Sequence, residues 1–369
     1  MKKICIFGGS SLYRLPVYNQ MSKEIGCDFY IVEDDPSMGI KTYDHKDLTN
    51  YKGSFYPMRL VDNFFWLNGA LSLLKKDYDI YVLGSPFCIS YWFIAICCLF
   101  SKKKATSWSH GMYGKESGLR KLIKKLYFNI CSMNFVYNER AIDVMKQSGI
   151  LRTKVTFVGN SLNTDHDLNI RAKLHKTDVL RRYFKNDYPI LIFVGRVTSI
   201  KRLDMVLDAM EILQKENTPV NFFVVGKDVD GVNLAAYAKS KGLSEQLYLY
   251  GPCYDDTVLG NLYYNADLCV SPGNVGLTAI SAMTFGCPVI SHNNLNLQMP
   301  ESETIKPGKT GDFFKEGDVM DLASKICTWL NNVDDNKREY IRKCAFEEVD
   351  TKWNIYSETQ CFKDAFNKL

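Results

Sequence analysis

Two cations flank a turn that the sequence places after a strand. The stretch "FVGRVTSIKRLD" (193–204) predicts a strand that ends at Gly195, with Arg196 and Lys201 on either side of the turn into the next helix. In a doubly wound sheet, ligands bind outside the carboxyl ends of the strands, where both side chains would project. Arg196 can bind two phosphate oxygens at once, and Lys201 adds a mobile point charge. The alternative is that both are solvated surface cations.

A second candidate anion site is the stretch "SPGNVGLTAISAMTFGCPVIS" (271–291). It predicts a strand end, a glycine turn over 273–276, a helix over 277–285 and another strand. The glycines permit close backbone approach, and the free N–H groups and dipole of a helix N-terminus attract an anion. The alternative is an ordinary strand–helix turn. The residues expected to face the anion are Asn274, Val275, Gly276, Leu277 and Thr278, the last as an extra donor.

Short apolar runs alternate with helical patterns along the chain, which predicts parallel sheets with helices on both faces. A helix is expected from the Asn138 cap to Gly149, and a core-facing helix over 202–215. Residues 165–188 are charged and lack strand character. The predicted strands are 4–9, 27–34, 78–85, 105–111, 133–138 and 154–160, then 189–196, 220–227, 247–251, 267–273 and 287–292.

The length of 369 residues is too great for one ordinary core. It fits two domains of about 150 to 200 residues with a cleft between them. The strand series place an N-terminal domain at 1–165 and a C-terminal domain at 185–350. We therefore expect an α/β fold with two Rossmann-like, doubly wound parallel-sheet domains.

The distribution of cysteines and charges indicates the cellular compartment and the class of partner. The twelve cysteines are dispersed, which argues against a disulfide framework and a zinc cluster. The apolar run near Met1 is too short for a secretory signal. We therefore expect a cytoplasmic protein. Residues 1–150 hold 20 Lys and Arg against 13 Asp and Glu, while the remainder holds 26 against 28. A basic N-terminal half suits an anionic membrane surface or a phosphate-bearing substrate, and no motif for reading nucleic acid is present.

Two segments have membrane-like composition. The run 87–100, "FCISYWFIAICCLF", is followed by three lysines but is shorter than the ~18 residues that span a bilayer, so we interpret it as a buried helix rather than a membrane dip. The segment 117–130 has leucines and isoleucines on one face and Arg120, Lys121, Lys124 and Lys125 on the other. An interfacial helix and a core-packed helix with a solvated basic face both fit this pattern.

Taken together, these motifs resemble the retaining glycosyltransferases of family 4, the glycosyl transferases group 1. That family has the GT-B arrangement, in which two Rossmann-like domains face each other across a cleft. The resemblance covers nearly the whole chain and is most specific over 189–314. It rests on Gly8-Gly9, His110-Gly111, "VGNSLNTD" (158–165), "FVGRVTSIKRLD", "GPCYDDTVLGNLYYNADLCVSPG", "AMTFGCPVISHNN" and "TKWNIYSE", the last of which implies that a helix over 351–369 packs back on the N-terminal domain.

The sequence departs from the family at one motif. The family has two glutamates, separated by seven residues, at the positions of Gly273 and Ser281, and neither is present here. Ser281 can make one neutral hydrogen bond to a ribose, worth about 1 kcal/mol against ~1.5–3 kcal/mol for a charged acceptor. Glu301 or Glu303, after the next strand, is a hypothetical substitute contact to the sugar.

The resemblance implies further roles. The donor is a nucleotide diphosphate sugar, linked to uridine or guanosine, whose diphosphate is held by Gly9 together with the two cations and the turn, without a metal or another cofactor. His110 is expected beside the donor sugar, and Arg196 and Lys201 would stabilise the leaving group. Lys227, Pro252, Cys253 and Ser281 are candidates for the base and ribose, and Ser10, Glu116 and Glu301 for the sugar or acceptor.

The resemblance also implies a setting. Transfer with retention of configuration to a hydroxyl of a glycan, carried on a lipid such as polyprenyl diphosphate at the inner membrane surface, would serve surface polysaccharide synthesis. Two other classes are weighed against it. One is a sugar-nucleotide epimerase or phosphorylase, for which neither a carboxylate pair nor a cofactor lysine is found. The other is a catalytically inactive partner subunit that still binds nucleotide sugars, which the missing glutamates favour.

Overall fold

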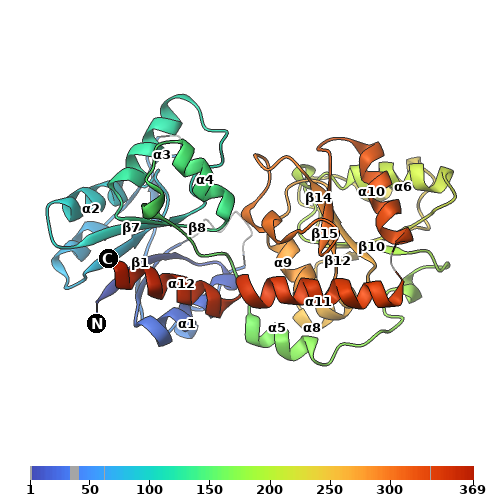
Figure 1. Ribbon diagram of the computed structural model, residues 1–369, viewed down its shortest axis with the longest axis horizontal. Helices are drawn as coiled ribbons and strands as arrows, with labels where there is room; N and C mark the ends of the chain where they lie inside the picture. Colours follow the sequence, from blue (N-terminus) through green and yellow to red (C-terminus); the bar gives the residue numbers. More distant parts are fainter. Residues whose placement is uncertain (1, 34–40, 62, 333) are drawn as a thin grey trace. The chain divides into compact units, whose positions relative to one another are not determined.

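The computed structural model describes residues 2–33, 41–61, 63–332 and 334–369. The chain divides into two compact units, Met1–Asn163 with Lys352–Leu369, and Thr164–Thr351 (Figure 1). Residues 166–184, which the sequence left between two domains, belong to the second unit and contain most of α5 (Thr164–Arg171) and the short helix η6 (Arg181–Tyr183). The last residue of the predicted strand 27–34 lies outside the described residues.

The first unit is built on one parallel seven-stranded sheet in the order β3-β2-β1-β6-β7-β8-β9. Six of its strands match predicted runs, whereas β3 and the separate hairpin β4–β5 were not predicted. The polar, glycine-containing sequence of β3, "YKGSF", lacks the apolar run that marks a buried strand. The strands are β1 (Ile4–Gly9), β2 (Asp28–Val32), β3 (Tyr51–Phe55), β4 (Pro57–Arg59), β5 (Phe65–Leu67), β6 (Ile80–Leu83), β7 (Lys104–Ser109), β8 (Met133–Val136) and β9 (Val155–Phe157).

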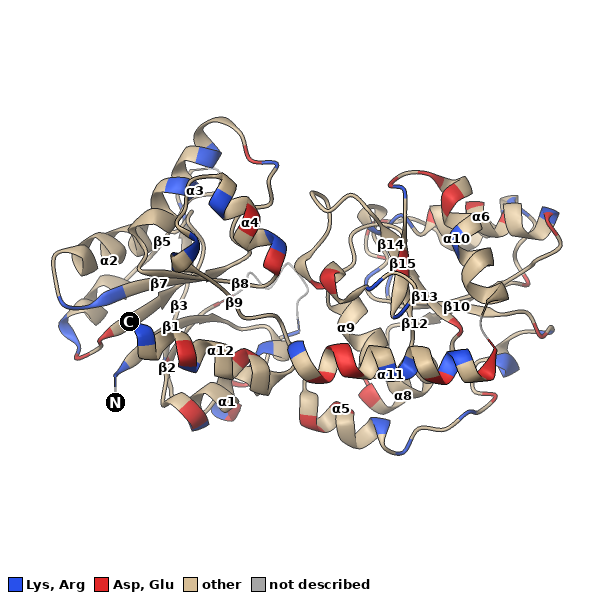
Figure 2. Cartoon of the chain, in the orientation of Figure 1, with Lys and Arg blue, Asp and Glu red and all other residues tan. Residues whose placement is uncertain are grey.

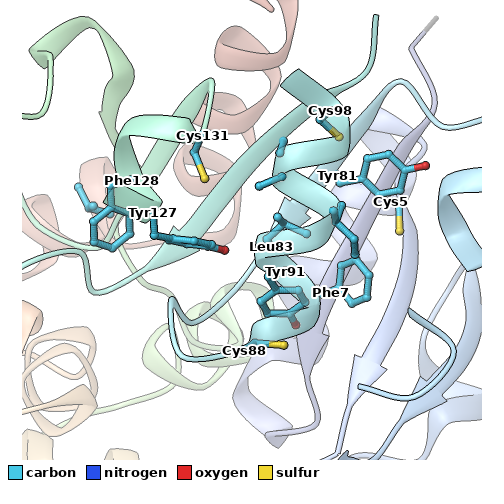
Figure 3. Packing of buried hydrophobic residues seen from close by; sticks show 14 of the residues in the cluster. Cys5, Phe7, Tyr81, Leu83, Cys88, Tyr91, Cys98, Tyr127, Phe128 and Cys131 are labelled. Carbon is cyan, nitrogen blue, oxygen red and sulfur yellow. The ribbon is translucent and has the colours of Figure 1, made fainter. Parts of the chain in front are cut away.

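Helices cover both faces of this sheet. One core holds side chains of α2 (Ile89–Leu99), α3 (Gly118–Ile130) and α4 (Glu139–Gln147). The other holds side chains of α1 (Leu15–Ile25) and α12 (Ile355–Lys368). Figure 3 shows the first core, where Tyr91 and Cys98 of α2 lie beside Phe7 and Tyr81 of the sheet. A doubly wound layer arrangement follows.

The expectation that 87–100 is a buried helix is only half right. Tyr91, Ile94, Ala95 and Cys98 of α2 pack on the sheet, but Phe93, Ile96, Leu99 and Phe100 are exposed. A helix that is apolar on all sides buries only the side that the sheet covers. No helix in the described ranges is long and apolar enough to span a bilayer.

The second unit has a parallel six-stranded sheet in the order β12-β11-β10-β13-β14-β15. With the first unit it confirms the predicted fold class of two Rossmann-like α/β domains. The short strand β15 was not predicted. The strands are β10 (Ile190–Val194), β11 (Asn221–Val225), β12 (Leu247–Gly251), β13 (Leu268–Ser271), β14 (Val289–His292) and β15 (Gly311–Phe314). The helices are α5, α6 (Asp204–Lys215), α7 (Leu234–Ser240), α8 (Asp256–Asn265), α9 (Leu277–Thr284), α10 (Val319–Asn331) and α11 (Asp335–Lys352).

The last helix, α12, completes the core of the first unit. Phe362 is fully buried, with its ring 4.7 Å from that of Trp108 and 4.4 Å from that of Phe135. Glu358 is also buried and accepts a hydrogen bond of 2.6 Å from the Ser161 hydroxyl. The start of the chain and its end therefore share one folded unit.

This packing predicts that the first unit depends on α12 for stability. Phe362→Ala should cost about 3–5 kcal/mol, because it removes a buried aromatic ring and leaves a cavity. Urea denaturation followed by circular dichroism measures the loss. Asn367→Ala, at an exposed position of the same helix, is the matched control and should change the unfolding midpoint little. An unfolding midpoint of Phe362→Ala equal to that of the control would contradict the role given to α12.

Candidate functional site

The order of strands in the second unit creates a crevice at one point of its sheet. The chain runs from β10 to β11 and β12 on one side, then returns to place β13 on the other side of β10. Loops that leave two neighbouring strands in opposite directions open a crevice at the carboxyl ends. The loop after β10 carries Arg196 and Lys201, and the loop after β13 carries the glycine turn 273–276. The fold thus brings together the two predicted anion-binding stretches.

Lys201 is held in place by the glycine turn. Its Nζ donates to the main-chain oxygen of Asn274 at 2.6 Å and to Oδ1 of the same residue at 2.9 Å. Two of the three ammonium protons are used, and one remains. Burial lowers the pKa of Lys201 to about 8, the negative charge of Glu301 raises it, and the positive charge of Arg196 lowers it. Lys201 is therefore a partly buried group that carries a positive charge at neutral pH.

Gly273 packs against the backbone of the short helix η7 (Ser199–Lys201). Its N–H donates to the Lys201 main-chain oxygen at 2.9 Å, and a Cβ at this position would lie 2.0 Å from the Ile200 main-chain oxygen. No side chain fits there without moving the backbone. The missing first glutamate of the resembling family therefore has a steric reason in this chain.

A buried glutamine fixes the rest of the turn. Gln298 Oε1 accepts a hydrogen bond from the Val275 N–H at 2.8 Å, and its Nε2 donates to Ser291 Oγ at 2.7 Å. Ser291 Oγ lies 3.2 Å from the Gly273 main-chain oxygen, within hydrogen-bonding distance. The expectation that Val275 donates to the ligand is wrong, because its amide is already used and the residue is buried. Sequence reasoning missed Gln298, which lies in a loop without a motif.

The N-terminus of α9 supplies the remaining main-chain donors. Gly276 is the N-cap residue, and within the described ranges the N–H groups of Gly276, Leu277 and Thr278 have no protein acceptor. The Thr278 hydroxyl donates to the Val194 main-chain oxygen at 3.0 Å, so it ties α9 to β10 and is not the expected extra donor. Three amides and the positive end of the helix dipole face the crevice.

The candidates for base and ribose lie along the same sheet edge. Lys227 follows β11 and Pro252 and Cys253 follow β12, and the Gly226 N–H donates to the Gly251 oxygen at 2.9 Å. Ser281 is partly exposed in the second turn of α9. These positions lie after β11, after β12 and on α9, at the same edge of the sheet as Arg196 and Lys201.

Glu301 lies close enough to Lys201 for its charge to act on that residue. It is buried in the short helix η8 (Pro300–Thr304), which packs on α9. Its charge acts on Lys201, whose pKa it raises. Glu303, in the same short helix, is less buried than Glu301. Of the two candidates, the structure brings Glu301 within electrostatic reach of the cradle.

His110 lies in the first unit, at the end of β7. Its ring lies 5.7 Å from that of Tyr113 and 4.9 Å from that of Tyr137, and its buried Nδ1 has no hydrogen-bond partner in the described part of the chain. Burial, and after it the positive charges of Arg14 and Lys124, lower the pKa of His110 to about 4. The imidazole is therefore neutral near pH 7, with one nitrogen able to donate and the other to accept.

Arg14 is a buried arginine that the sequence analysis did not identify, and its positive charge lowers the pKa of His110. The Arg14 guanidinium lies over the rings of Trp108 and Tyr137, at 4.9 Å from each centroid, and donates to the Tyr137 hydroxyl at 2.7 Å. It also lies 3.5 Å from the Glu358 carboxylate of α12. In the sequence, Arg14 is marked only as a cation that precedes a helix with one apolar face.

Glu116 holds the loop after His110. Its carboxylate accepts from the N–H groups of Tyr113 and Gly114 and pairs with Lys124 at 2.6 Å. Burial would raise the pKa of Glu116, but these donors more than offset it, and the pKa is below its ordinary value. The expectation of an acceptor contact is wrong, since the buried carboxylate is fully used by its own loop.

Gly9 and Ser10 end the first strand of the same unit. The Gly9 N–H donates to the Tyr18 hydroxyl at 3.0 Å, so the expected donation to a diphosphate is not available from this amide. Ser10 is buried, and its main-chain oxygen accepts from the Tyr43 N–H. For metals, no group of three or more His, Cys, Asp or Glu side chains suited to an ion occurs among the residues that the structure describes.

Comparison with known proteins gives a family pattern for part of the chain. Residues 177–348 match the model of the family described as Glycosyl transferases group 1. A poly(ribitol-phosphate) alpha-N-acetylglucosaminyltransferase of Staphylococcus aureus is 24% identical over 204 residues, covering 53% of this chain and 38% of that protein. An uncharacterized glycosyltransferase of Haemophilus influenzae is 21% identical over 372 residues, covering 96% of this chain and 99% of that protein.

The solved structures show the fold. The crystal structure of HepE from Anabaena in complex with UDP superimposes with a TM-score of 0.75 at 15% identity and covers 100% of both chains. The aligned part of this chain spans less than half the length of the first curated relatives, 38% and 30%. The whole chain therefore has the GT-B fold, and its residues 177–348 carry the sequence pattern of glycosyl transferases group 1.

Proposed function

We propose that this protein is a glycosyltransferase that moves a sugar from a nucleotide diphosphate sugar to a hydroxyl of a glycan. The observation that carries the proposal is the cradle formed by Arg196, Lys201 and the amides of Gly276, Leu277 and Thr278. Fixed cationic and N–H donors around one crevice match the charge of a diphosphate. The group 1 pattern over 177–348 supports the same reaction class.

The cradle would accelerate the reaction by stabilising the leaving group. The bond between the anomeric carbon and the phosphate oxygen breaks while the acceptor oxygen bonds to that carbon, and the acceptor proton passes to the departing phosphate oxygen. Negative charge grows on the diphosphate as the sugar becomes oxocarbenium-like, so preorganised donors stabilise the transition state more than the ground state. Retention and front-face attack are proposed on the resemblance to family 4, as is the independence from a metal.

His110 would serve as a neutral hydrogen-bonding group toward the donor sugar. Its low pKa makes it a poor general base, because the conjugate acid would be too strong to hold the acceptor proton at neutral pH. A neutral imidazole can instead form a hydrogen bond with a sugar hydroxyl. Glu301 is proposed as the second contact to the sugar, in place of the missing first glutamate.

The substrates are proposed from relatives. HepE was crystallised with UDP, which favours a uridine donor over guanosine, and the Staphylococcus aureus relative acts on a poly(ribitol-phosphate). We therefore propose a surface glycan as the acceptor, carried on a membrane lipid diphosphate, as the basic composition of the first unit suggests. Incubation with UDP- and GDP-sugars and glycan acceptors, with and without EDTA, tests this proposal. Turnover with UDP-sugar that EDTA leaves unchanged is expected.

A nucleotide-sugar-binding subunit without catalytic activity is the second candidate. The observation in its favour is the steric exclusion of any carboxylate at Gly273. Such a subunit would bind UDP-sugar in a calorimeter yet neither transfer nor hydrolyse it. Slow hydrolysis of the donor in the absence of acceptor would show that the protein is an active enzyme rather than a binding subunit.

The cradle predicts distinct effects of neighbouring cations on nucleotide affinity. Arg196→Ala and Lys201→Ala should each weaken UDP binding about tenfold to a hundredfold, because each removes a charged hydrogen bond worth ~1.5–3 kcal/mol. Isothermal titration calorimetry measures the affinity. Arg202→Asn is the matched control: it removes a cation from the same turn that pairs with Asp204, and asparagine tolerates its φ of 53°. Equal UDP affinities for all three variants would contradict the cradle.

Lys201 predicts a pH dependence of UDP binding. Its pKa of about 8 in the free protein means that the ammonium loses its proton as the pH rises through that value. Bound diphosphate favours the charged form of Lys201, so UDP affinity should be highest near pH 7, where the terminal phosphate of UDP is also ionised, and fall by up to tenfold per pH unit above pH 8. Lys201→Gln should bind weakly with a flat profile over the same range. A wild-type profile that stays flat to pH 9.5 would rule out direct contact of the Lys201 charge.

His110 predicts an unusual titration and mutational pattern. Its pKa of about 4 should place the midpoint of its ring resonances in NMR well below the ordinary value of ~6.5. Because the proposed role is a neutral hydrogen bond, His110→Gln should keep more transfer activity than His110→Ala, by about tenfold. A midpoint near 6.5, or equal loss in both variants, would exclude this role.

A further inference from the structure

The outer faces of α2 and α3 form an apolar surface that is exposed among the residues that the structure describes. Leu119, Leu122 and Leu126 recur along one side of α3 and are at least half exposed, Leu119 at 71%. On α2, Phe93, Ile96, Leu99 and Phe100 are exposed, the last at 86%. Residues three and four apart share one side of a helix, so each helix presents a stripe. Sequence analysis left open whether α3 packs its apolar face inward, and the structure shows its leucines outward.

The two stripes belong to one surface. Both helices pack on the same core of the first unit, and the Trp92 ring of α2 lies 5.4 Å from the Tyr127 ring of α3. Helices in one layer turn their outer sides in the same direction. The hairpin β4–β5 extends this surface, because Trp66 packs edge-on against Phe93 at 5.8 Å and Met58 pairs with Trp66 across the hairpin.

The segment that carries α2 and α3 is almost entirely positive in charge. Between Ile80 and Asn138 the sequence has eight Lys and Arg residues and one acid, Glu116, which is already paired with Lys124. Figure 2 shows the basic positions on α3 and on the loop between α2 and β7, while α2 itself carries no charge. An exposed apolar surface inside a positive field calls for an occupant that is both apolar and anionic.

A basic groove adjoins the leucine stripe. It has a volume of about 400 Å³ and lies between α3 and the end of α4, lined by Lys121, Leu122, Lys125 and residues 147–149. Lys121 and Lys125 are one helical turn apart, so their ammonium groups can reach the same side of α3. Leu122 belongs to both the groove and the stripe. Ammonium groups thus sit beside exposed leucines, as in helices that lie in a membrane interface.

We propose that this surface docks the protein on an anionic phospholipid membrane, with the side chains of α2 and α3 among the acyl chains and Lys121 and Lys125 on lipid phosphates. A second copy of the chain would bring two excesses of seven positive charges together, which argues against a homodimer. A nucleic acid would match the charge but not the apolar stripes. The proposal is independent of the donor cradle, which lies in the other unit.

Vesicle sedimentation tests this surface with the full chain. Wild type should bind vesicles of phosphatidylglycerol and phosphatidylcholine, and at least tenfold more weakly vesicles of phosphatidylcholine alone. The variants Lys121→Glu/Lys125→Glu and Phe93→Ser/Phe100→Ser should each lose at least tenfold in affinity for the anionic vesicles. Controls of matched chemistry in the second unit, Lys239→Glu/Lys309→Glu and Met320→Ser, should bind vesicles as wild type does. All variants should keep the far-ultraviolet circular dichroism spectrum and the urea unfolding curve of wild type, which shows that both units fold.

Three outcomes would overturn the proposal. Wild type could fail to bind anionic vesicles. Either the basic or the apolar variant could bind them as well as wild type, which would mean that the two features do not act together. Finally, analytical ultracentrifugation could show a wild-type dimer that Phe93→Ser/Phe100→Ser dissociates, in which case a second copy covers this surface.

Discussion

The contact between the turn after β10 and the turn after β13 is the constraint on which the donor site depends. Gly273 donates to the Lys201 main-chain oxygen, and the Lys201 side chain returns two hydrogen bonds to Asn274. Each turn thereby fixes the other, so the cation and the amides of α9 face the same crevice. The approach is close enough that only glycine fits at 273. The same contact explains why Lys201 is held in place and why no carboxylate occupies position 273.

The electrostatics of the cradle follow from this packing. Lys201 is partly buried, and its pKa is lowered first by this burial and to a smaller extent by the positive charge of Arg196. An anionic ligand would favour the charged form of Lys201, so the cradle suits a diphosphate. The negative charge of Glu301 raises the pKa of Lys201 and so opposes the effect of burial. In the other unit, burial is the main cause of the low pKa of His110, and the positive charge of Arg14 adds to it.

Local pattern was sufficient for the fold and for part of the site. Alternating apolar runs predicted most strands of both sheets, because buried parallel strands must be apolar. Arg196, Lys201 and Gly276 could be proposed from the sequence because they follow predicted strands. The bonds of Val275 and Thr278 could not be foreseen, because their partners are distant in sequence. Gln298, for example, lies 23 residues from the amide that it accepts. Those of Glu116 and Gly9 join near neighbours, but in loops and strand ends whose geometry no motif specifies.

A crystal structure of the protein with UDP would test the central claim most directly. The diphosphate should lie between the Arg196 and Lys201 side chains and the amides of Gly276, Leu277 and Thr278, with the base toward the loops after β11 and β12. The third Lys201 proton should point at a phosphate oxygen while the bonds to Asn274 persist. A diphosphate bound elsewhere, or a Lys201 that leaves Asn274 and makes no phosphate contact, would contradict it.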